Sequence, residues 1–401
     1  MKTEIIKYKN EHSHSVYASI IFMGGSNACD NPNSGLAHLV EHMLFRACGE
    51  LSQEEFYKET ARHGITINAS TCDSHLEVNF RCLPEKLPVA VQLVSGMLTA
   101  EWDKNMLAFE KQVIIAETYN PSSSYVTKLK NKYLNALSTK SNLGTKTSVS
   151  RFTLKKALEA RKKVLGGKRY FIIAGNFNEA DYAPLIDVLD GFEDHVREIK
   201  HSATKYEKVS IKTHDYNYVS VTFVFNKRDV SYERLVMLKS ILFEGLESPV
   251  QYSLREQKGY TYSVDTEIWY LGEKGLLNIY YEVEDTENIL PSLVELISII
   301  GNREKHVTED NLKLSKPFHT TNLNFLYDDN RALVEECEYS LTNLGIIFDI
   351  KSEKRKFESV TLLDVIDTAK TVLNEDSVAI EIGCVNAQKL KRSMALIKDK
   401  I

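Results

Sequence analysis

The chain has 401 residues, more than the ~250 to 300 at which a single hydrophobic core usually stops growing, so two domains are expected. Its 43% hydrophobic and 26% charged residues are typical of a globular fold and exclude an intrinsically disordered chain. Fifty basic and 55 acidic residues give a net charge of -5, which provides no general attraction for polyanions. We therefore expect neither a nucleic-acid partner nor a membrane partner.

The cysteines and the N-terminus indicate a reducing compartment. The six cysteines show no Cys-x-x-Cys spacing and lie mostly among apolar neighbours, as free core thiols do. The N-terminal residues alternate charged with apolar side chains, unlike a signal peptide, and no uncharged run of ~18 residues follows. We therefore expect a cytoplasmic location.

In the first half of the chain, the hydrophobic pattern predicts a compact α+β unit. Its elements are a buried strand, two helices, a β-hairpin, two further helices and a closing strand, at residues 15–22, 34–46, 53–62, 64–71 with 75–83, 86–99, 103–119 and 170–174. The hairpin follows from alternating apolar residues on either side of a short polar turn.

The second half repeats this order of elements. It predicts strands at 219–225, 260–269, 276–283 and 378–382, and helices at 231–246, from 249, 287–300, 309–345 with a break, and 361–373. We therefore predict two homologous α+β domains, each with an antiparallel or mixed sheet and helices packed on one face. The polar stretch 194–208 resembles a linker, so the domains are placed at 1–199 and 200–401.

The predicted helix 34–46 carries the clearest chemical signal. It is apolar on nearly every side except for three ionisable residues, His38, Glu41 and His42. With ~100° per residue, the two histidines stand one turn apart within about 40°, and the glutamate lies about 60° to the other side of His38. Two imidazoles at this spacing can bind one tetrahedral Zn2+, with the carboxylate beside the open position of the metal.

A purely structural role is the alternative for these three residues. With 11 histidines in the chain, His-x-x-Glu-His arises by chance in roughly a few per cent of such sequences. However, ionisable groups in an apolar helix carry a large desolvation cost unless they are paired or bind a metal, and the neighbouring sequence offers no partners. The metal site is therefore favoured.

A hydrolytic zinc site needs a third protein ligand. The predicted helix 103–119 carries Glu110 and Glu117, which are seven residues apart and therefore lie on nearly the same face. Taken alone, such a pair is more typical of a solvent-exposed helix. Together with the histidine motif, it offers a suitable donor.

The combination of the two motifs resembles a known family. His-x-x-Glu-His on a helix, followed some 75 residues later by a glutamate with another seven residues before it, is similar to the inverzincins of the pitrilysin, insulin-degrading enzyme and mitochondrial processing peptidase family. The resemblance covers the whole chain. It implies that the two domains form one half of a clam-shell chamber.

The resemblance implies a complete metallopeptidase site. It assigns His38, His42 and Glu117 as ligands of one Zn2+ per chain, Glu41 as general base, and Glu110 as the carboxylate that orients a ligand. The implied reaction is hydrolysis of a peptide bond by a zinc-activated water, without a covalent intermediate.

The resemblance also implies residues that contact the substrate. Asn68 and Ala69 match the edge strand to which the substrate adds its own strand. Arg255 and Tyr262 match the pair that contacts the peptide and polarises the scissile carbonyl. Tyr260 stands where the family usually has a small aliphatic residue, so it is an alternative to Tyr262.

The expected function is a zinc-dependent endopeptidase that acts on short or unfolded peptides, with maturation of a ribosomally made precursor as a narrower version. Since the short members of the family complete each site with a segment of the other subunit, we expect a homodimer with sites completed in trans. A heterodimer with a paralogue is the alternative assembly. The alternative function is a non-catalytic or partner-dependent subunit.

Overall fold

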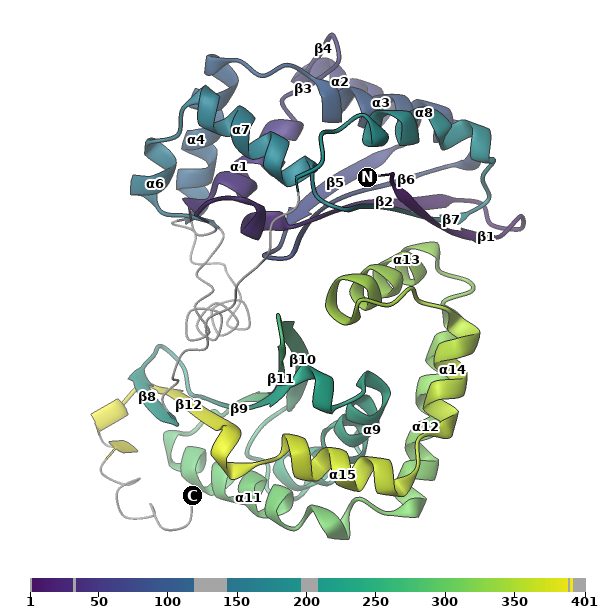
Figure 1. The fold of residues 1–401 in the computed structure, drawn as a ribbon. Helices are drawn as coiled ribbons and strands as arrows, with labels where there is room; N and C mark the ends of the chain where they lie inside the picture. Colours follow the sequence, from purple (N-terminus) through teal and green to yellow (C-terminus); the bar gives the residue numbers. More distant parts are fainter. Residues whose placement is uncertain (1, 32–33, 119–142, 196–207, 389, 392–401) are drawn as a thin grey trace. The chain divides into compact units, whose positions relative to one another are not determined.

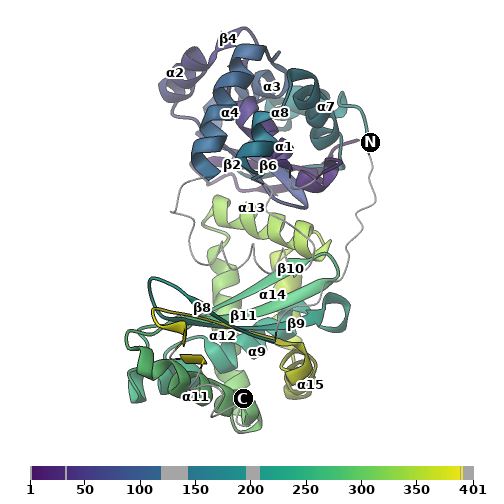
Figure 2. The ribbon, with the colours of Figure 1, turned by 90° about the vertical axis from the view of Figure 1, so that its left-hand side faces the viewer.

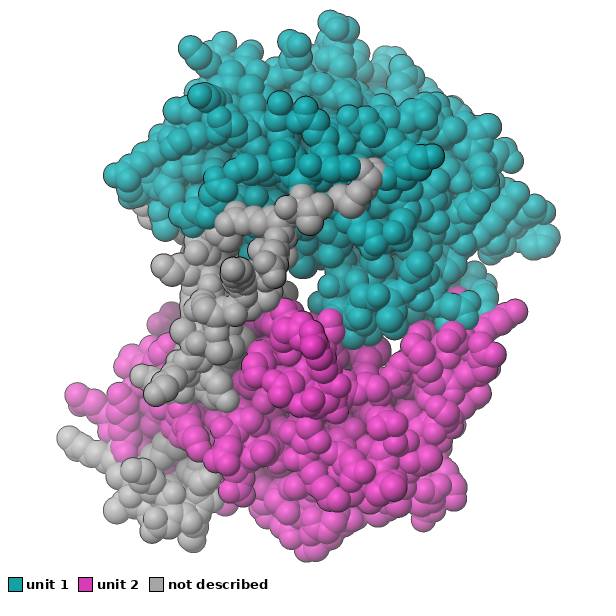
Figure 3. Space-filling model, in the orientation of Figure 1, with its two compact units in different colours: residues 1–204, 325–349 teal, residues 205–324, 350–401 magenta. Residues whose placement is uncertain are grey.

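The structure, a computed structural model, describes residues 2–31, 34–118, 143–195, 208–388 and 390–391. The chain divides into two compact units (Figures 1 and 3). Unit 1 contains residues 1–204 and 325–349, and unit 2 contains residues 205–324 and 350–401. In the described part of the chain, no helix is long and apolar enough to cross a membrane.

Unit 1 is built on a five-stranded mixed sheet with the order β1-β7-β2-β6-β5. The strands are β1 (Glu4–Lys9), β2 (Val16–Met23), β5 (Thr66–Thr71), β6 (His75–Cys82) and β7 (Arg169–Gly175). β1 pairs with β7 in parallel, and the other neighbours are antiparallel. β5 is therefore an edge strand, which pairs with β6 alone among the described residues.

Helices cover one face of this sheet (Figure 1). They are α1 (Leu36–Leu44), α2 (Gln53–His63), α3 (Leu87–Thr99), α4 (Lys104–Thr118), α6 (Lys146–Ser150), α7 (Leu154–Leu165) and α8 (Glu179–Asp190), with a small hairpin of β3 (Ala47–Cys48) and β4 (Leu51–Ser52). Alternation along β2 sends Val16, Ala18, Ile20 and Phe22 into the core beneath the helices. The core thus lies between the sheet and the helix layer that contains α1.

A helix from late in the chain covers the opposite face of the sheet. α13 (Asn330–Tyr339) packs against β2 and β7, opposite α3 and α8 (Figures 1 and 2). The amide of Asn330 donates to the Oγ of Ser13 at 2.7 Å and to the carbonyl oxygen of Ser15 at 3.0 Å. Nε2 of His75 lies 3.1 Å from Oε1 of Glu338.

Unit 2 repeats the architecture of unit 1. Its sheet has the order β10-β11-β9-β12-β8, with strands β8 (Val209–Thr213), β9 (Tyr218–Asn226), β10 (Asp265–Leu271), β11 (Lys274–Glu282) and β12 (Val378–Cys384). β8 pairs with β12 in parallel, as β1 does with β7, and each other strand has its counterpart in the same place. The predicted pair of homologous α+β units is therefore confirmed.

The helices of unit 2 lie mainly beneath its sheet (Figure 1). They are α9 (Tyr232–Phe243), α10 (Pro249–Gln251), α11 (Ile289–Gly301), α12 (Glu309–Phe325), α14 (Ile350–Ser359) and α15 (Leu362–Val372), with a π-helical turn at Tyr252–Gln257. A second π-helical turn, Ser340–Leu344, follows α13 in unit 1.

Several boundaries differ from the sequence-based prediction. The segment 325–349 was placed in the second domain, whereas it packs in unit 1, because contacts such as that of Asn330 with Ser15 join residues 315 positions apart. The strand expected from residue 260 begins at Asp265, after Gly259 takes a left-handed conformation with φ of 61°. Helices α8 and α14 were not predicted. Most of the predicted linker lies outside the described residues.

The contacts of Asn330 predict the behaviour of α13. Asn330→Ala removes the side-chain donor that ties the start of the helix to the loop before β2, which should weaken local docking by about 1–2 kcal/mol. Hydrogen exchange of residues 330–339 should therefore become about 5- to 30-fold faster. Asn324→Ala, an exposed position at the end of α12, serves as the control and should leave the exchange of α13 unchanged. Equal exchange in both variants would contradict this role of Asn330.

Candidate metal centre

Helix α1 is a core helix with a polar exception. It begins after Gly35, which is left-handed with φ of 83° and where an added Cβ would lie 2.6 Å from the carbonyl oxygen of Leu143. Five of its apolar residues are almost fully buried, namely Ala37, Leu39, Val40, Met43 and Leu44, and Leu36 is partly buried. His38 is also buried, with 6% exposure, and Glu41 and His42 are partly buried. Three ionisable side chains therefore sit in surroundings that disfavour unpaired charge.

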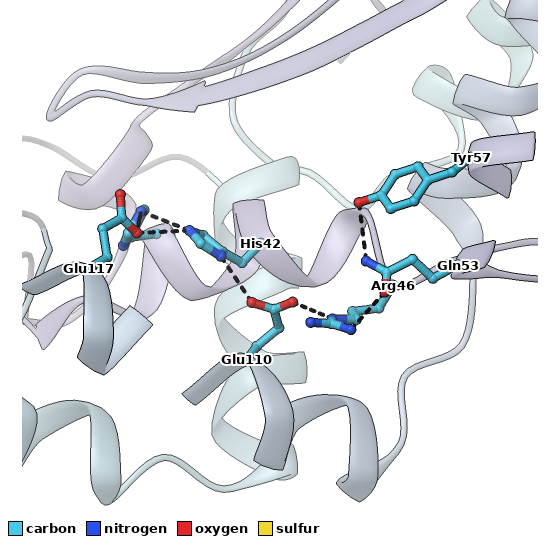
Figure 4. A network of polar contacts seen from close by, with 7 residues as sticks. His42, Arg46, Gln53, Tyr57, Glu110 and Glu117 are labelled. Carbon is cyan, nitrogen blue, oxygen red and sulfur yellow. Dashed lines mark hydrogen bonds and ion pairs between the residues drawn. The ribbon is translucent and has the colours of Figure 1, made fainter. Parts of the chain in front are cut away.

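The packing of α4 against α1 brings a third residue to the two histidines. The two Nε2 atoms of His38 and His42 lie 3.1 Å apart, and Oε2 of Glu117 lies 3.6 Å from the first and 3.4 Å from the second (Figure 4). Zn2+ with tetrahedral bonds of about 2.0–2.1 Å holds its ligand atoms about 3.3–3.4 Å apart. The three donor atoms fit one such ion, because their separations bracket this value.

The charge state of His38 suits a metal ligand. Burial and the neighbouring His42 lower the pKa of His38 to about 3, so its imidazole is neutral near pH 7. Its Nδ1 is buried, and no residue in the described part of the chain forms a hydrogen bond with it. Its Nε2 is the atom that faces His42 and Glu117.

His42 is held by a carboxylate on its other side. Its Nδ1 lies 2.9 Å from Oε2 of Glu110, a residue of α4 with 4% exposure. Burial lowers the pKa of His42. The hydrogen bond to Glu110 and the charge of Glu110 raise this pKa by more than burial lowers it, so the net shift is upward. In the neutral ring, Nδ1–H donates to Glu110 and Nε2 keeps the lone pair that a metal needs.

Glu41 lies beside the histidines but outside this group of three. Burial raises the pKa of its carboxyl, and its contact with Thr71 at the end of β5 opposes that shift. β5 also contacts α1, so the edge strand and the metal centre are neighbours within unit 1. On this strand Asn68 is exposed and lies opposite Asn79 of β6, whereas the side chain of Ala69 is buried.

The remaining predicted residues lie in unit 2. Arg255 belongs to the π-helical turn, and its guanidinium lies 4.8 Å from the centre of the Tyr262 ring. Tyr262 is 81% exposed, whereas Tyr260 is half-buried and its backbone N–H donates to the carbonyl oxygen of Leu254. Of the two tyrosines, Tyr262 is thus the more exposed. Within unit 2, Arg255 and Tyr262 therefore form a cluster of their own.

A further set of polar residues was not anticipated from the sequence. Arg46 contacts Glu110 through Nε and donates from Nη1 to Oε1 of Gln53 at 2.8 Å (Figure 4). Its guanidinium also lies over the ring of Phe109, 4.1 Å from the ring centre. Nε2 of Gln53 in turn donates to the hydroxyl of Tyr57 at 3.1 Å. The available signal was the four-residue spacing of His42 and Arg46 within the predicted helix 34–46, although in the structure Arg46 follows the end of α1.

Comparison with known proteins gives consistent matches along the chain. Residues 5–149 match the model described as "Insulinase (Peptidase family M16)", and residues 151–316 match "Peptidase M16 inactive domain". A protein of Rickettsia bellii named "Uncharacterized zinc protease" is 21% identical over 396 residues, which cover 94% of this chain and 95% of that protein.

Solved structures share the fold over nearly the full length. A structure described as the peptidase M16 inactive domain from Pseudomonas fluorescens has a TM-score of 0.82 and 16% identity, covering 97% of this chain and 98% of that one. A protease from Helicobacter pylori has a TM-score of 0.80 and 15% identity, covering 95% and 96%. At these identities the likeness concerns the fold alone.

The ligand geometry predicts stoichiometric zinc binding. The protein should bind one Zn2+ per chain, and His42→Ala should weaken binding by more than about a hundredfold, because loss of a ligand costs more than loss of a residue that only orients one. The dissociation constant is measured by competition with a chromogenic chelator. His63→Ala, on α2 beside Glu59, is the control and should bind zinc normally. Normal zinc affinity in His42→Ala would exclude this site.

Proposed function

The chain is a short, two-domain member of peptidase family M16, and on that premise we propose that it is a zinc-dependent endopeptidase. The observation that carries the proposal is the convergence of His38, His42 and Glu117 on one point. Two neutral imidazoles and one carboxylate are one of the donor sets found in catalytic zinc sites. Zinc bound there would polarise the scissile carbonyl and lower the pKa of a water molecule.

Each residue around that point has a role in the proposed reaction. Glu41 takes a proton from the attacking water and returns it to the departing amine. Its position on α1, one residue before His42, keeps it beside the metal ligands without making it one of them. Glu110 keeps His42 in the tautomer that presents Nε2.

The edge of β5 supplies the proposed binding mode for the substrate. A peptide in extended conformation can add, through main-chain hydrogen bonds, to the edge of this strand that no described strand occupies, with Asn68 and Ala69 as contact points. Because such binding requires an extended chain, the substrates are short or unfolded peptides. Arg255 and Tyr262 are proposed to contact the same peptide, with the Tyr262 hydroxyl donating to the developing oxyanion.

The proposed assembly is a homodimer in which each site is completed in trans. The metal ligands belong to unit 1, and the Arg255 and Tyr262 cluster belongs to unit 2. A two-fold arrangement can bring unit 2 of one subunit to unit 1 of the other and so form two equivalent sites. In a heterodimer, unit 2 of a paralogue would complete the site in the same way.

A non-catalytic or partner-dependent subunit is the second candidate function. It is favoured by the description of the model that matches residues 151–316, which names an inactive domain. Against it stands the ligand set of unit 1, in which each of the three donor residues is present and convergent. An active protein on its own would exclude this candidate.

Substitution of the proposed base tests the reaction. Glu41→Gln should leave zinc content at one ion per chain and lower the rate of cleavage of an unstructured fluorogenic peptide by about 10^2- to 10^4-fold, since a positioned base contributes that much. Glu54→Gln, an exposed glutamate paired with Lys58, should cleave at the wild-type rate. Unchanged turnover in Glu41→Gln would remove this residue from the mechanism.

Complementation between inactive chains tests the assembly. Mixing Glu41→Gln chains with Tyr262→Phe chains should restore about a quarter of the wild-type rate, because random pairing gives half mixed dimers, each with one complete site. The same mixture with Tyr260→Phe chains in place of Tyr262→Phe chains shows which of the two tyrosines is needed for cleavage. No gain over the separate variants would contradict completion in trans, as would full activity in a strict monomer.

A further inference from the structure

A chain of polar contacts leads away from the metal centre into the protein. It runs from His42 to Glu110, on to Arg46 and Gln53, and ends at Tyr57 (Figure 4). The contacts join three elements, because Glu110 is on α4, Arg46 follows the end of α1, and Gln53 opens α2. The two carboxylate oxygens of Glu110 are divided between two partners, Oε2 facing His42 and Oε1 facing Arg46.

We propose that Arg46 is a positioning residue of the metal centre, which fixes the orientation of Glu110 and, through it, the orientation of His42. The inference rests on the proposed metal centre and adds a residue that none of the motifs contains. Arg46 does not touch the point where His38, His42 and Glu117 converge.

The first argument concerns charge. The side chain of Glu110 is only 5% exposed, and a buried carboxylate without a cationic or hydrogen-bonding partner is strongly destabilising. Arg46, whose side chain is 12% exposed, brings a permanent positive charge into direct contact with it. The guanidinium therefore offsets part of the desolvation cost of the Glu110 carboxylate. Without Arg46, the hydrogen bond to His42 would have to offset that cost alone.

The second argument concerns orientation. The guanidinium is planar, and three contacts fix its plane: Nε faces Glu110, Nη1 faces Gln53, and Phe109 packs on its face. Gln53 is itself fixed at the start of α2, which Ser52 and Glu55 close with a capping box. A guanidinium held in this way restricts Glu110 to the rotamer that meets Nδ1 of His42.

The third argument comes from the asymmetry of the two histidines. Nδ1 of His38 is buried and no described residue forms a hydrogen bond with it, whereas Nδ1 of His42 meets Glu110. Among the described residues, the hydrogen bond between His42 and Glu110 is therefore the one that orients the histidine pair through an Nδ1 atom. Lysine at position 46 would keep the charge but not the planar, two-acceptor geometry.

A double-mutant cycle read out as zinc affinity tests the inference. Glu110→Gln should weaken zinc binding about 10- to 100-fold, and Arg46→Gln about tenfold, the low end of the range for residues that orient a ligating histidine. If Arg46 acts through Glu110, the double variant should bind zinc no more weakly than Glu110→Gln alone. Arg62→Gln, an exposed arginine of α2 paired with Glu59, is the matched control and should bind normally.

Two further measurements separate positioning from general stability. Arg46→Lys should recover part of the affinity lost in Arg46→Gln, and the melting temperature of the metal-free protein shows whether each variant is folded. Wild-type zinc affinity in folded Arg46→Gln, or losses that multiply in the double variant, would overturn the inference while leaving the proposed function standing. Failure of the wild-type protein to bind zinc would overturn both.

Discussion

The structure depends on one constraint, the cost of placing ionisable groups in an apolar helix. α1 is buried on almost every side, yet it carries His38, Glu41 and His42. Such groups persist in a core only when hydrogen bonds, opposite charges or a metal satisfy them. The packing of α4 against α1 meets this constraint, because it supplies Glu110 to one side of His42 and Glu117 to the other.

The duplicated fold separates two kinds of chemistry. Both units have the same strand order, but the proposed ligands His38, His42 and Glu117 lie in unit 1, and α9, which follows β9 as α1 follows β2, carries no histidine. Unit 2 instead presents an exposed tyrosine beside an arginine on a π-helical turn. In the proposed function, one copy of the fold holds the metal and the other contacts the peptide.

Much of this could be predicted from local sequence patterns. Helical geometry puts His38 and His42 one turn apart and Glu110 and Glu117 on nearly the same face. The resemblance to the inverzincin family was needed to select the two glutamates as partners of the histidines. Most strands along the chain followed from two-residue periodicity and from the repeat, whereas β8 and the order of the strands within each sheet were not predicted. The roles of Arg46 and α13 could not be predicted, because they depend on contacts between residues that are distant in the chain, such as Arg46 with Glu110 and His75 with Glu338.

The central claim is that one divalent ion binds between α1 and α4. Anomalous diffraction at the zinc absorption edge from crystals of the metal-loaded protein tests this most directly. The account predicts a single strong peak per chain, within about 2.0–2.2 Å of the Nε2 atoms of His38 and His42 and of a carboxylate oxygen of Glu117. A peak bound to other residues, or no peak between these two helices, would contradict it.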